Sequence, residues 1–222
     1  MFEEDRIQTS AGELKITFVG HGTLILTFGG KLFHVDPYSR LADYETLPKA
    51  DVILITHSHG DHLDPKAIAA LRKEGTAVVL TEKAAEQMPG GIVMKNGETR
   101  TVAGIRIEAV PAYNLLHKRP TGEPFHPRGE GNGYVLTFGA TRVYVAGDTE
   151  DIPEMKKLGD IAIAFLPMNL PYTMTPEQAA HAARAFRPKL LYPYHYGETD
   201  PKELARLLAA EKEIEVRIRR LK

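Results

Sequence analysis

The sequence contains no cysteine, which excludes disulfides, a thiolate nucleophile and any cysteine-ligated zinc or iron–sulfur site. It also lacks an apolar run of the roughly 20 residues that a membrane-spanning helix needs. The first residues, MFEEDRIQTS, are acidic and polar, unlike a signal peptide. From these absences we expect a cytoplasmic protein that does not insert into a membrane.

A strong charge of either sign is absent as well. The 222 residues carry a formal net charge of −1, which removes the electrostatic argument for binding nucleic acid. Hydrophobic residues make up 43% and charged residues 26%, as is typical of a globular protein with a substantial core. Any metal site must be built from His, Asp and Glu, and the chain has nine histidines.

An internal repeat organises the chain. Residues 20–29 (GHGTLILTFG) are similar to residues 131–139 (GNGYVLTFG). Each segment leads through a short turn and a second β-rich run to an aspartate, Asp36 in the first half and Asp148 in the second. Alternating and continuous apolar residues with glycine turns predict a β-meander at these places.

A second pair of segments extends the repeat. Short apolar runs at 50–57 and 159–167 indicate buried strands, and each precedes a segment that begins at a proline, Pro65 or Pro176. A capping residue followed by proline is typical of a helix start. We expect helices at about 65–74, 176–186 and 201–210, and an edge strand at 215–219.

The repeat predicts an α/β fold with two mixed β-sheets face to face and helices outside, a four-layer αββα sandwich with pseudo-twofold internal duplication. No linker rich in serine and glycine separates the halves, about 1–95 and 98–222. We therefore expect a single domain over 1–222.

The strongest chemical signal is the segment THSHGDHLD at 56–64, directly after the buried run VILIT. It places His57, His59, Asp61 and His62 within six residues, around a turn at Gly60. Imidazole and carboxylate groups suit zinc, iron or manganese. Four potential ligands are more than one ion normally takes from one loop, so the loop indicates two metal ions.

Two further candidates follow predicted strands. Asp148 ends the run VYVAG and His195 ends the run LLYPY. Each could instead be structural, Asp148 as a turn or cap residue and His195 as a packed core histidine. Since ligands gather outside the carboxyl ends of strands in α/β sheets, the repeat places both at the same edge as His57.

Together these residues resemble the metallo-β-lactamase superfamily, whose αββα duplication would cover nearly the whole chain. The run GHGTLILTFGGKLFHVDP is further similar to the branch that contains L-ascorbate 6-phosphate lactonase and N-acylphosphatidylethanolamine-type phospholipase D. The resemblance implies one metal held by His57 and His59, a second held by Asp61, His62 and His195, and Asp148 bridging the two.

One ligand of that pattern is missing from its usual place. The family normally offers a histidine after a strand in the middle of the chain, where this sequence has Tyr113 and Asn114. The candidates to replace it are His117 and His126, and the sequence also allows that neither serves. We favour His126, because the prolines on either side would restrain it, whereas His117 precedes two cationic residues.

Two further residues, Asp36 and His21, are candidates for positions around the metal ligands. Asp36 resembles an acceptor that orients a ligand histidine through its other ring nitrogen, although a turn residue before Pro37 is an equal alternative. His21 is either a similar outer partner, a substrate contact or a polar turn residue. His34 and His181 are expected to be structural.

The resemblance implies a hydrolase with two divalent ions, for which we expect zinc, with manganese or iron as alternatives. The ions would activate a shared hydroxide, oriented by the catalytic carboxylate of Asp61. The partner would be a small ester, lactone or phosphodiester. Lys118, Arg119 and Arg128 indicate either an anionic substrate or a solvated loop.

Two other functions are weighed against this one. A nucleic-acid-processing metallo-nuclease is disfavoured by the net charge and by the lack of room for an extra domain. A non-hydrolytic di-metal redox protein is disfavoured because His59 is intact where the redox branch carries a glutamate. Homo-oligomer formation is left open.

Overall fold

The structure is a computed structural model and describes residues 2–222. It contains two seven-stranded mixed sheets, each formed by seven consecutive strands of the chain. The first sheet comprises β1 (Glu3–Thr9), β2 (Gly12–Gly20), β3 (Thr23–Phe28), β4 (Lys31–Val35), β5 (Val52–Leu54), β6 (Ala77–Leu80) and β7 (Ile92–Val93). The second comprises β8 (Thr99–Val102), β9 (Ile105–Ala112), β10 (Gly131–Phe138), β11 (Thr141–Val145), β12 (Ile161–Pro167), β13 (Leu190–Tyr194) and β14 (Glu215–Val216).

The two sheets have the same topology. In each, the first four strands pair antiparallel as a meander, and the last four pair parallel. The aspartates of the sequence repeat follow matching strands, Asp36 after β4 and Asp148 after β11. The internal duplication is therefore visible in the strand order itself.

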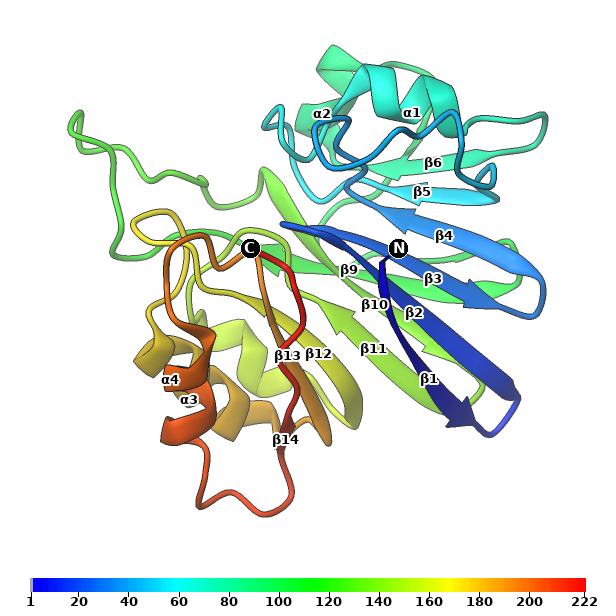
Figure 1. Ribbon diagram of the computed structural model, residues 1–222. Helices are drawn as coiled ribbons and strands as arrows, with labels where there is room; N and C mark the ends of the chain where they lie inside the picture. The colour runs from blue at the N-terminus through cyan, green and yellow to red at the C-terminus, as the bar shows by residue number, and fades with distance from the viewer. Residues whose placement is uncertain (1) are drawn as a thin grey trace.

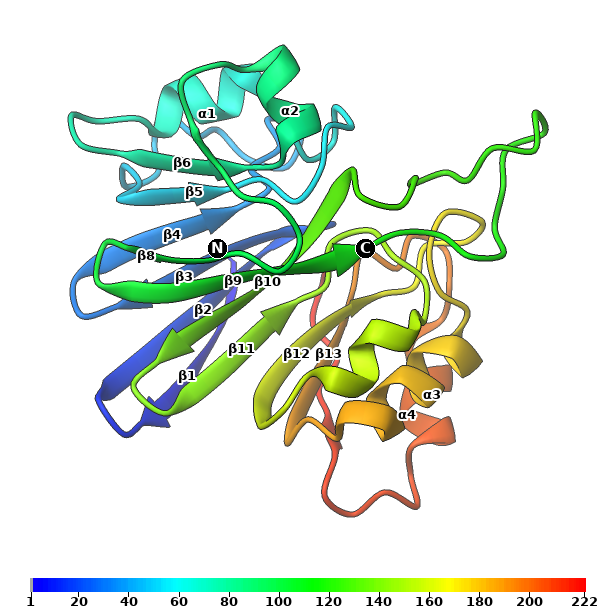
Figure 2. The same ribbon diagram turned by 180° about the vertical axis from the view of Figure 1, so that it is seen from behind.

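Helices cover the outer faces of both sheets (Figures 1 and 2). The first sheet carries α1 (Pro65–Leu71) and α2 (Glu82–Gln87), and the second carries the 3-10 helix η1 (Pro153–Lys157), α3 (Pro176–Phe186) and α4 (Pro201–Leu207). The main core lies between the sheets, where Phe18 contacts Tyr192 and Phe33 contacts Phe138. The predicted αββα sandwich is confirmed.

Local signals set the helix starts. The Asp64 side chain accepts from the backbone N–H groups of Lys66 and Ala67, with Pro65 as the first helical residue. Thr175 and Gln178 form a reciprocal capping box at the start of α3. Two helices are shorter than expected: α1 ends at Leu71, because Arg72 is already extended, and α4 ends at Leu207.

Several elements were not expected from the sequence. β1 alternates exposed charged residues with half-buried ones on an edge strand, which gives little hydrophobic periodicity. The hydrophobic pattern of the sequence also did not predict the short elements α2, η1, β7 and β8. The expected edge strand at 215–219 is present as β14, but it stops at Val216. No helix within residues 2–222 is long and apolar enough to cross a membrane.

A polar clamp joins the two ends of the chain. Asp5 on β1 accepts hydrogen bonds from the Tyr192 hydroxyl on β13 and from the Arg219 guanidinium, with Arg219 Nη2 at 2.8 and 2.9 Å from its two oxygens. Burial by itself would raise the pKa of Asp5, but Tyr192 and Arg219 outweigh it and hold the pKa below its usual value. Because β1 and β13 belong to different sheets, the clamp ties the sheets together.

We predict that Asp5→Asn lowers the free energy of unfolding by about 1–3 kcal/mol at neutral pH, because the ionised acceptor of the clamp is lost. Since the folded pKa lies below the ordinary value of 3.8, the contribution is complete above that pH and is lost as the pH falls through the folded pKa. Urea unfolding at pH 7 and pH 3 should therefore show the difference between wild type and variant shrinking in acid. Glu45→Gln, in an exposed pair with Lys49, is the control expected to change little.

Candidate metal centre

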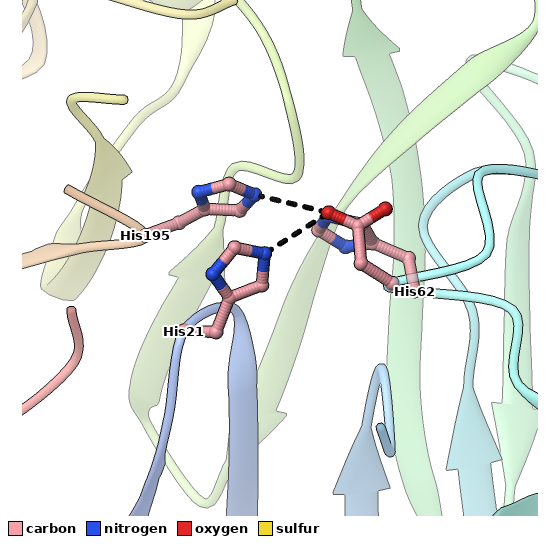
Figure 3. Close-up of side chains that lie close together, drawn as sticks. His21, His62 and His195 are labelled. Atoms are coloured by element: carbon pink, nitrogen blue, oxygen red, sulfur yellow. Dashed lines mark hydrogen bonds and ion pairs between the residues drawn. The ribbon is translucent and has the colours of Figure 1, made fainter. Parts of the chain in front are cut away.

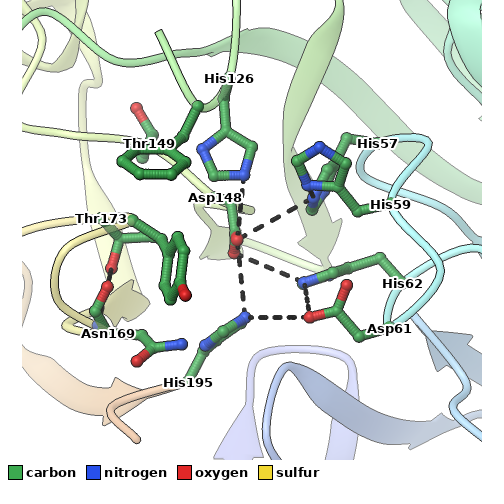
Figure 4. A network of polar contacts seen from close by, with 12 residues as sticks. His57, His59, Asp61, His62, His126, Asp148, Thr149, Asn169, Thr173 and His195 are labelled. Carbon is green, nitrogen blue, oxygen red and sulfur yellow. Dashed lines mark hydrogen bonds and ion pairs between the residues drawn. The ribbon is translucent and has the colours of Figure 1, made fainter. Parts of the chain in front are cut away.

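The predicted ligands converge at one edge of the sandwich, where strands of both sheets end (Figure 4). The histidine-rich loop at 56–64 follows β5, Asp148 follows β11, and His195 follows β13. Loop 113–130, between β9 and β10, returns to the same edge with His126. Carboxyl ends of parallel strands meet at one sheet edge, which is why residues so distant in sequence come together.

Three histidines form a first group. One ring nitrogen of each of His57, His59 and His126 lies within 4.8 Å of the other two. His57 Nε2 is 3.1 Å from His59 Nδ1. Three imidazoles around one point are the protein ligand set that zinc uses in catalytic sites.

A second group lies beside the first. Ligand atoms of His21, Asp61, His62 and His195 also fall within 4.8 Å of one another. Asp61 Oδ2 lies 3.7 Å from His62 Nε2 and 3.8 Å from His195 Nε2, so a single carboxylate oxygen faces both imidazoles. His21 thus lies in the same group as the three residues that the resemblance assigns to the second metal.

Asp148 lies between the two groups and is almost fully buried. Its Oδ2 is 3.2 Å from His126 Nε2 and 3.5 Å from His195 Nε2, while its Oδ1 is 3.6 Å from His62 Nε2. One carboxylate oxygen of Asp148 thus faces a histidine of each group. This is the position that a bridging carboxylate requires.

Buried polar atoms without partners show that the groups fit a cation. His62 Nε2, Asp148 Oδ1 and both ring nitrogens of His195 are buried and have no hydrogen-bond partner. Buried polar atoms are almost always paired, and leaving one unpaired costs about 1–3 kcal/mol. Divalent ions would satisfy three of these atoms, His62 Nε2, Asp148 Oδ1 and His195 Nε2.

The charges of the cluster support the same interpretation. Burial opposes ionisation of Asp148, yet the surrounding histidines, His195 and His62 foremost, hold its pKa well below the usual value. Burial lowers the pKa of His57 well below its ordinary value and that of His195 to about 4. Asp148 and Asp36 overcome burial at His62 and raise its pKa to about 10. A buried anion is thus surrounded by mostly neutral imidazoles, and a metal would replace the proton on His62.

An outer partner orients His62. Asp36 Oδ2 accepts a hydrogen bond from His62 Nδ1 at 2.8 Å, and the same carboxylate accepts from the backbone N–H and the hydroxyl of Thr56. This fixes the ring so that Nε2 faces Asp148. The geometry is the one that the resemblance implies for Asp36.

Asn114, at the place where the family carries a histidine, supports the substitute ligand. Its Oδ1 accepts from His126 Nδ1 at 2.7 Å and from the His126 backbone N–H at 2.8 Å, which directs His126 Nε2 towards Asp148. The amide of Asn114 donates to the buried carboxylate of Glu150, which in turn accepts the backbone N–H groups of residues 115–117. Sequence reasoning missed these supporting roles of Asn114 and Glu150.

The other candidate, His117, does not join the cluster. Its Nδ1 donates to the carbonyl of Thr173 and lies 3.0 Å from Glu150. His34 is buried on β4, and His181 is exposed and pairs with Asp151. Neither reaches the site, as expected.

A cavity of about 470 Å³ opens in front of the two groups, lined by Arg119, Phe125, Asn169 and Tyr172 together with the candidate ligands. Arg119 is the only lysine or arginine among its lining residues. Arg128 pairs with Glu154 at 2.6 Å and lies over the ring of Tyr113, which favours the solvated-loop alternative for this residue. Lys118 does not line the cavity either.

Comparison with known proteins shows which protein family this chain matches. A family model described as "Beta-lactamase superfamily domain" matches residues 15–195. A metal-dependent hydrolase of Thermococcus onnurineus is 32% identical over 221 residues, which cover 90% of this chain and 95% of that protein.

Solved structures show the same architecture. A crystal structure from Parabacteroides distasonis, provisionally named a metal-dependent hydrolase, is 55% identical, with a TM-score of 0.96 and full coverage of both chains. A metallo hydrolase from Ignicoccus hospitalis is 26% identical, with a TM-score of 0.77 over 94% of this chain and 96% of that one.

We predict that His126→Ala removes about one metal equivalent per chain, because the first group would keep only two imidazoles. His117→Ala is the matched control on the same loop and should leave the metal content unchanged. Plasma emission analysis after reconstitution and desalting measures both. Equal metal content in the two variants would show that His126 is not a ligand of the first ion.

Proposed function

The chain belongs to the metallo-β-lactamase superfamily, and on this basis we propose that it is a metal-dependent hydrolase with two divalent ions acting on a small anionic substrate. The observation that carries the proposal is the pair of ligand groups that share Asp148, with buried nitrogen and oxygen atoms left unpaired between them. Imidazole and carboxylate ligands suit zinc first, and also manganese or iron.

Each group would hold one ion, with Asp148 between the two. The ligands of one ion would be His57, His59 and His126, and those of the other would be Asp61, His62 and His195. Bound there, such ions supply a nucleophilic water near neutral pH and polarise the bond to be cleaved.

Asp61 would move the proton in this proposal. Within residues 2–222, the side-chain contacts of Asp61 all involve Oδ2, which faces the ligand nitrogens. Its Oδ1 is left to accept a hydrogen bond from the attacking water and to take up its proton. Tyr172 lies on the cavity wall and is a candidate to protonate the leaving group.

The cavity supports a small anionic substrate. Its volume of about 470 Å³ lies within the range of about 300–1,000 Å³ that is usual for small-molecule sites. Arg119 lies over the ring of Phe125, whose edge contacts Tyr172. Arg119 has no carboxylate within 4.0 Å among the residues described, so its charge is available to a carboxylate or phosphate group of an ester, lactone or phosphodiester.

We predict that the protein binds close to two metal ions per chain and that Asp148→Ala loses most of this binding, because both groups lose their shared anion. Asp43→Ala, on an exposed loop, is the control expected to keep both ions. The measurement is metal content after chelation and reconstitution, with thermal unfolding followed on metal addition. Wild-type protein that takes up no metal would contradict the proposal.

We further predict that Arg119→Ala raises KM for an anionic substrate by about tenfold or more and lowers kcat less, because the contact exists in the ground and transition states alike. Arg128→Ala, whose guanidinium is already paired with Glu154, should leave KM unchanged. A screen with lactone, ester, thioester and phosphodiester substrates, each with and without a charged group, supplies the substrate. An unchanged KM in Arg119→Ala would contradict the proposal that the substrate is anionic, but it would leave the proposed hydrolase activity standing.

A further inference from the structure

The turn between β2 and β3 holds one more histidine against the metal centre. His21 has a φ of 50°, a left-handed conformation that is uncommon for residues other than glycine. Its backbone is fixed on both sides, because its N–H donates to the carbonyl of Lys222 and its carbonyl accepts from the N–H of His195, both at 3.1 Å. Strained residues held in this way are concentrated at functional sites.

The glycine that follows makes the close approach possible. A Cβ on Gly22 would lie 3.0 Å from His62 Cε1 and 3.6 Å from His195 Cδ2. The backbone of the turn therefore lies directly against two of the predicted ligands. The imidazole of His21 is held in the same place, with ring centroids 3.7 Å from His195 (Figure 3).

The His21 side chain points to the atoms that face the metal position. Its Nε2 is 3.0 Å from Asp61 Oδ2, the oxygen that also faces the Nε2 atoms of His62 and His195. All four ligand atoms lie within 4.8 Å of one another.

This contact differs from those of Asp36 and Asn114, which each orient a candidate ligand from outside the cluster. Asp36 meets His62 at Nδ1, and Asn114 meets His126 at Nδ1, in each case the nitrogen turned away from the cluster. An outer partner of Asp61 would likewise be expected at its other oxygen, Oδ1. His21 instead approaches the inner oxygen, as another ligand of the same ion would.

We infer that His21 is a fourth protein ligand of the ion held by Asp61, His62 and His195, an inference that rests on the metal centre proposed above. The two ions would then differ. Counting Asp148, one ion would have five protein ligands and the other four. The ion of His57, His59 and His126 would therefore accept water or substrate as an additional ligand more readily, and the His21 ion would be the tighter of the two.

The test compares His21→Asn with wild-type protein. Asparagine tolerates positive φ better than most residues, so the turn can keep its backbone while the imidazole is lost. His181→Asn is the matched control, since His181 is exposed on α3, pairs with Asp151 and belongs to none of the ligand groups. Metal-free protein is titrated with zinc or cobalt against a competing chromophoric chelator, which measures the affinity for each ion.

We predict that His21→Asn weakens the tighter ion by more than about 100-fold, beyond the 10–100-fold typical of losing an outer partner, and that the second ion changes little. Anomalous diffraction from metal-loaded wild-type crystals should place His21 Nε2 about 2.1 Å from that ion. His181→Asn should bind both ions as the wild type does. If His21→Asn does not fold without metal, as judged by circular dichroism, His21→Gly suits the same φ and replaces it.

The outcomes separate the two proposals. Wild-type protein with two ions, and a His21 variant with unchanged affinities, would overturn the role of His21 and leave the proposed function standing. A metal-loaded structure in which His21 Nε2 bonds Asp61 and lies more than about 3 Å from the ion, well beyond a zinc–nitrogen bond, would overturn that role too. Wild-type protein that binds no metal would overturn both.

Discussion

A buried carboxylate is the constraint on which the centre depends. Asp148 is buried where the two sheets meet. Among residues 2–222, no hydrogen-bond donor reaches its Oδ1. An isolated buried anion is costly, so positive charge must compensate it. In the metal-free protein the proton on His62 supplies part of that charge, and a divalent ion on each side would supply more than a proton can.

The duplicated topology explains why so many ligands reach this carboxylate. Each half ends its meander with an aspartate at the same edge, but the two aspartates lie in different surroundings. Asp36 is saturated by Thr56 and His62 and serves as a support, whereas Asp148 faces open ligand nitrogens. One repeated structural position thus provides an orienting group in the first half and the proposed bridging group in the second.

Loop 113–130 brings another histidine to the group in which the family's usual histidine is missing. Asn114 cannot serve as the expected imidazole, but its side-chain oxygen fixes His126, twelve residues further along, with Nε2 towards Asp148. Glu150, two residues after Asp148, fixes the start of the same loop through backbone hydrogen bonds. Hydrogen bonds therefore link His126 through Asn114 to Glu150, two residues after Asp148.

The sequence by itself determined the duplicated αββα architecture and the candidate ligands of the 56–64 loop, because hydrophobic periodicity and close spacing are local properties. It also singled out Asp148 and His195 at strand ends, while edge elements such as β1 carried too little periodicity to be predicted. The flanking prolines already favoured His126 over His117, but the contact by which Asn114 orients His126, the approach of His21 to Asp61 and the place of Arg119 on the cavity wall were decided only by tertiary structure. Each depends on how loops far apart in sequence pack together, and no local pattern records the direction in which a loop side chain points.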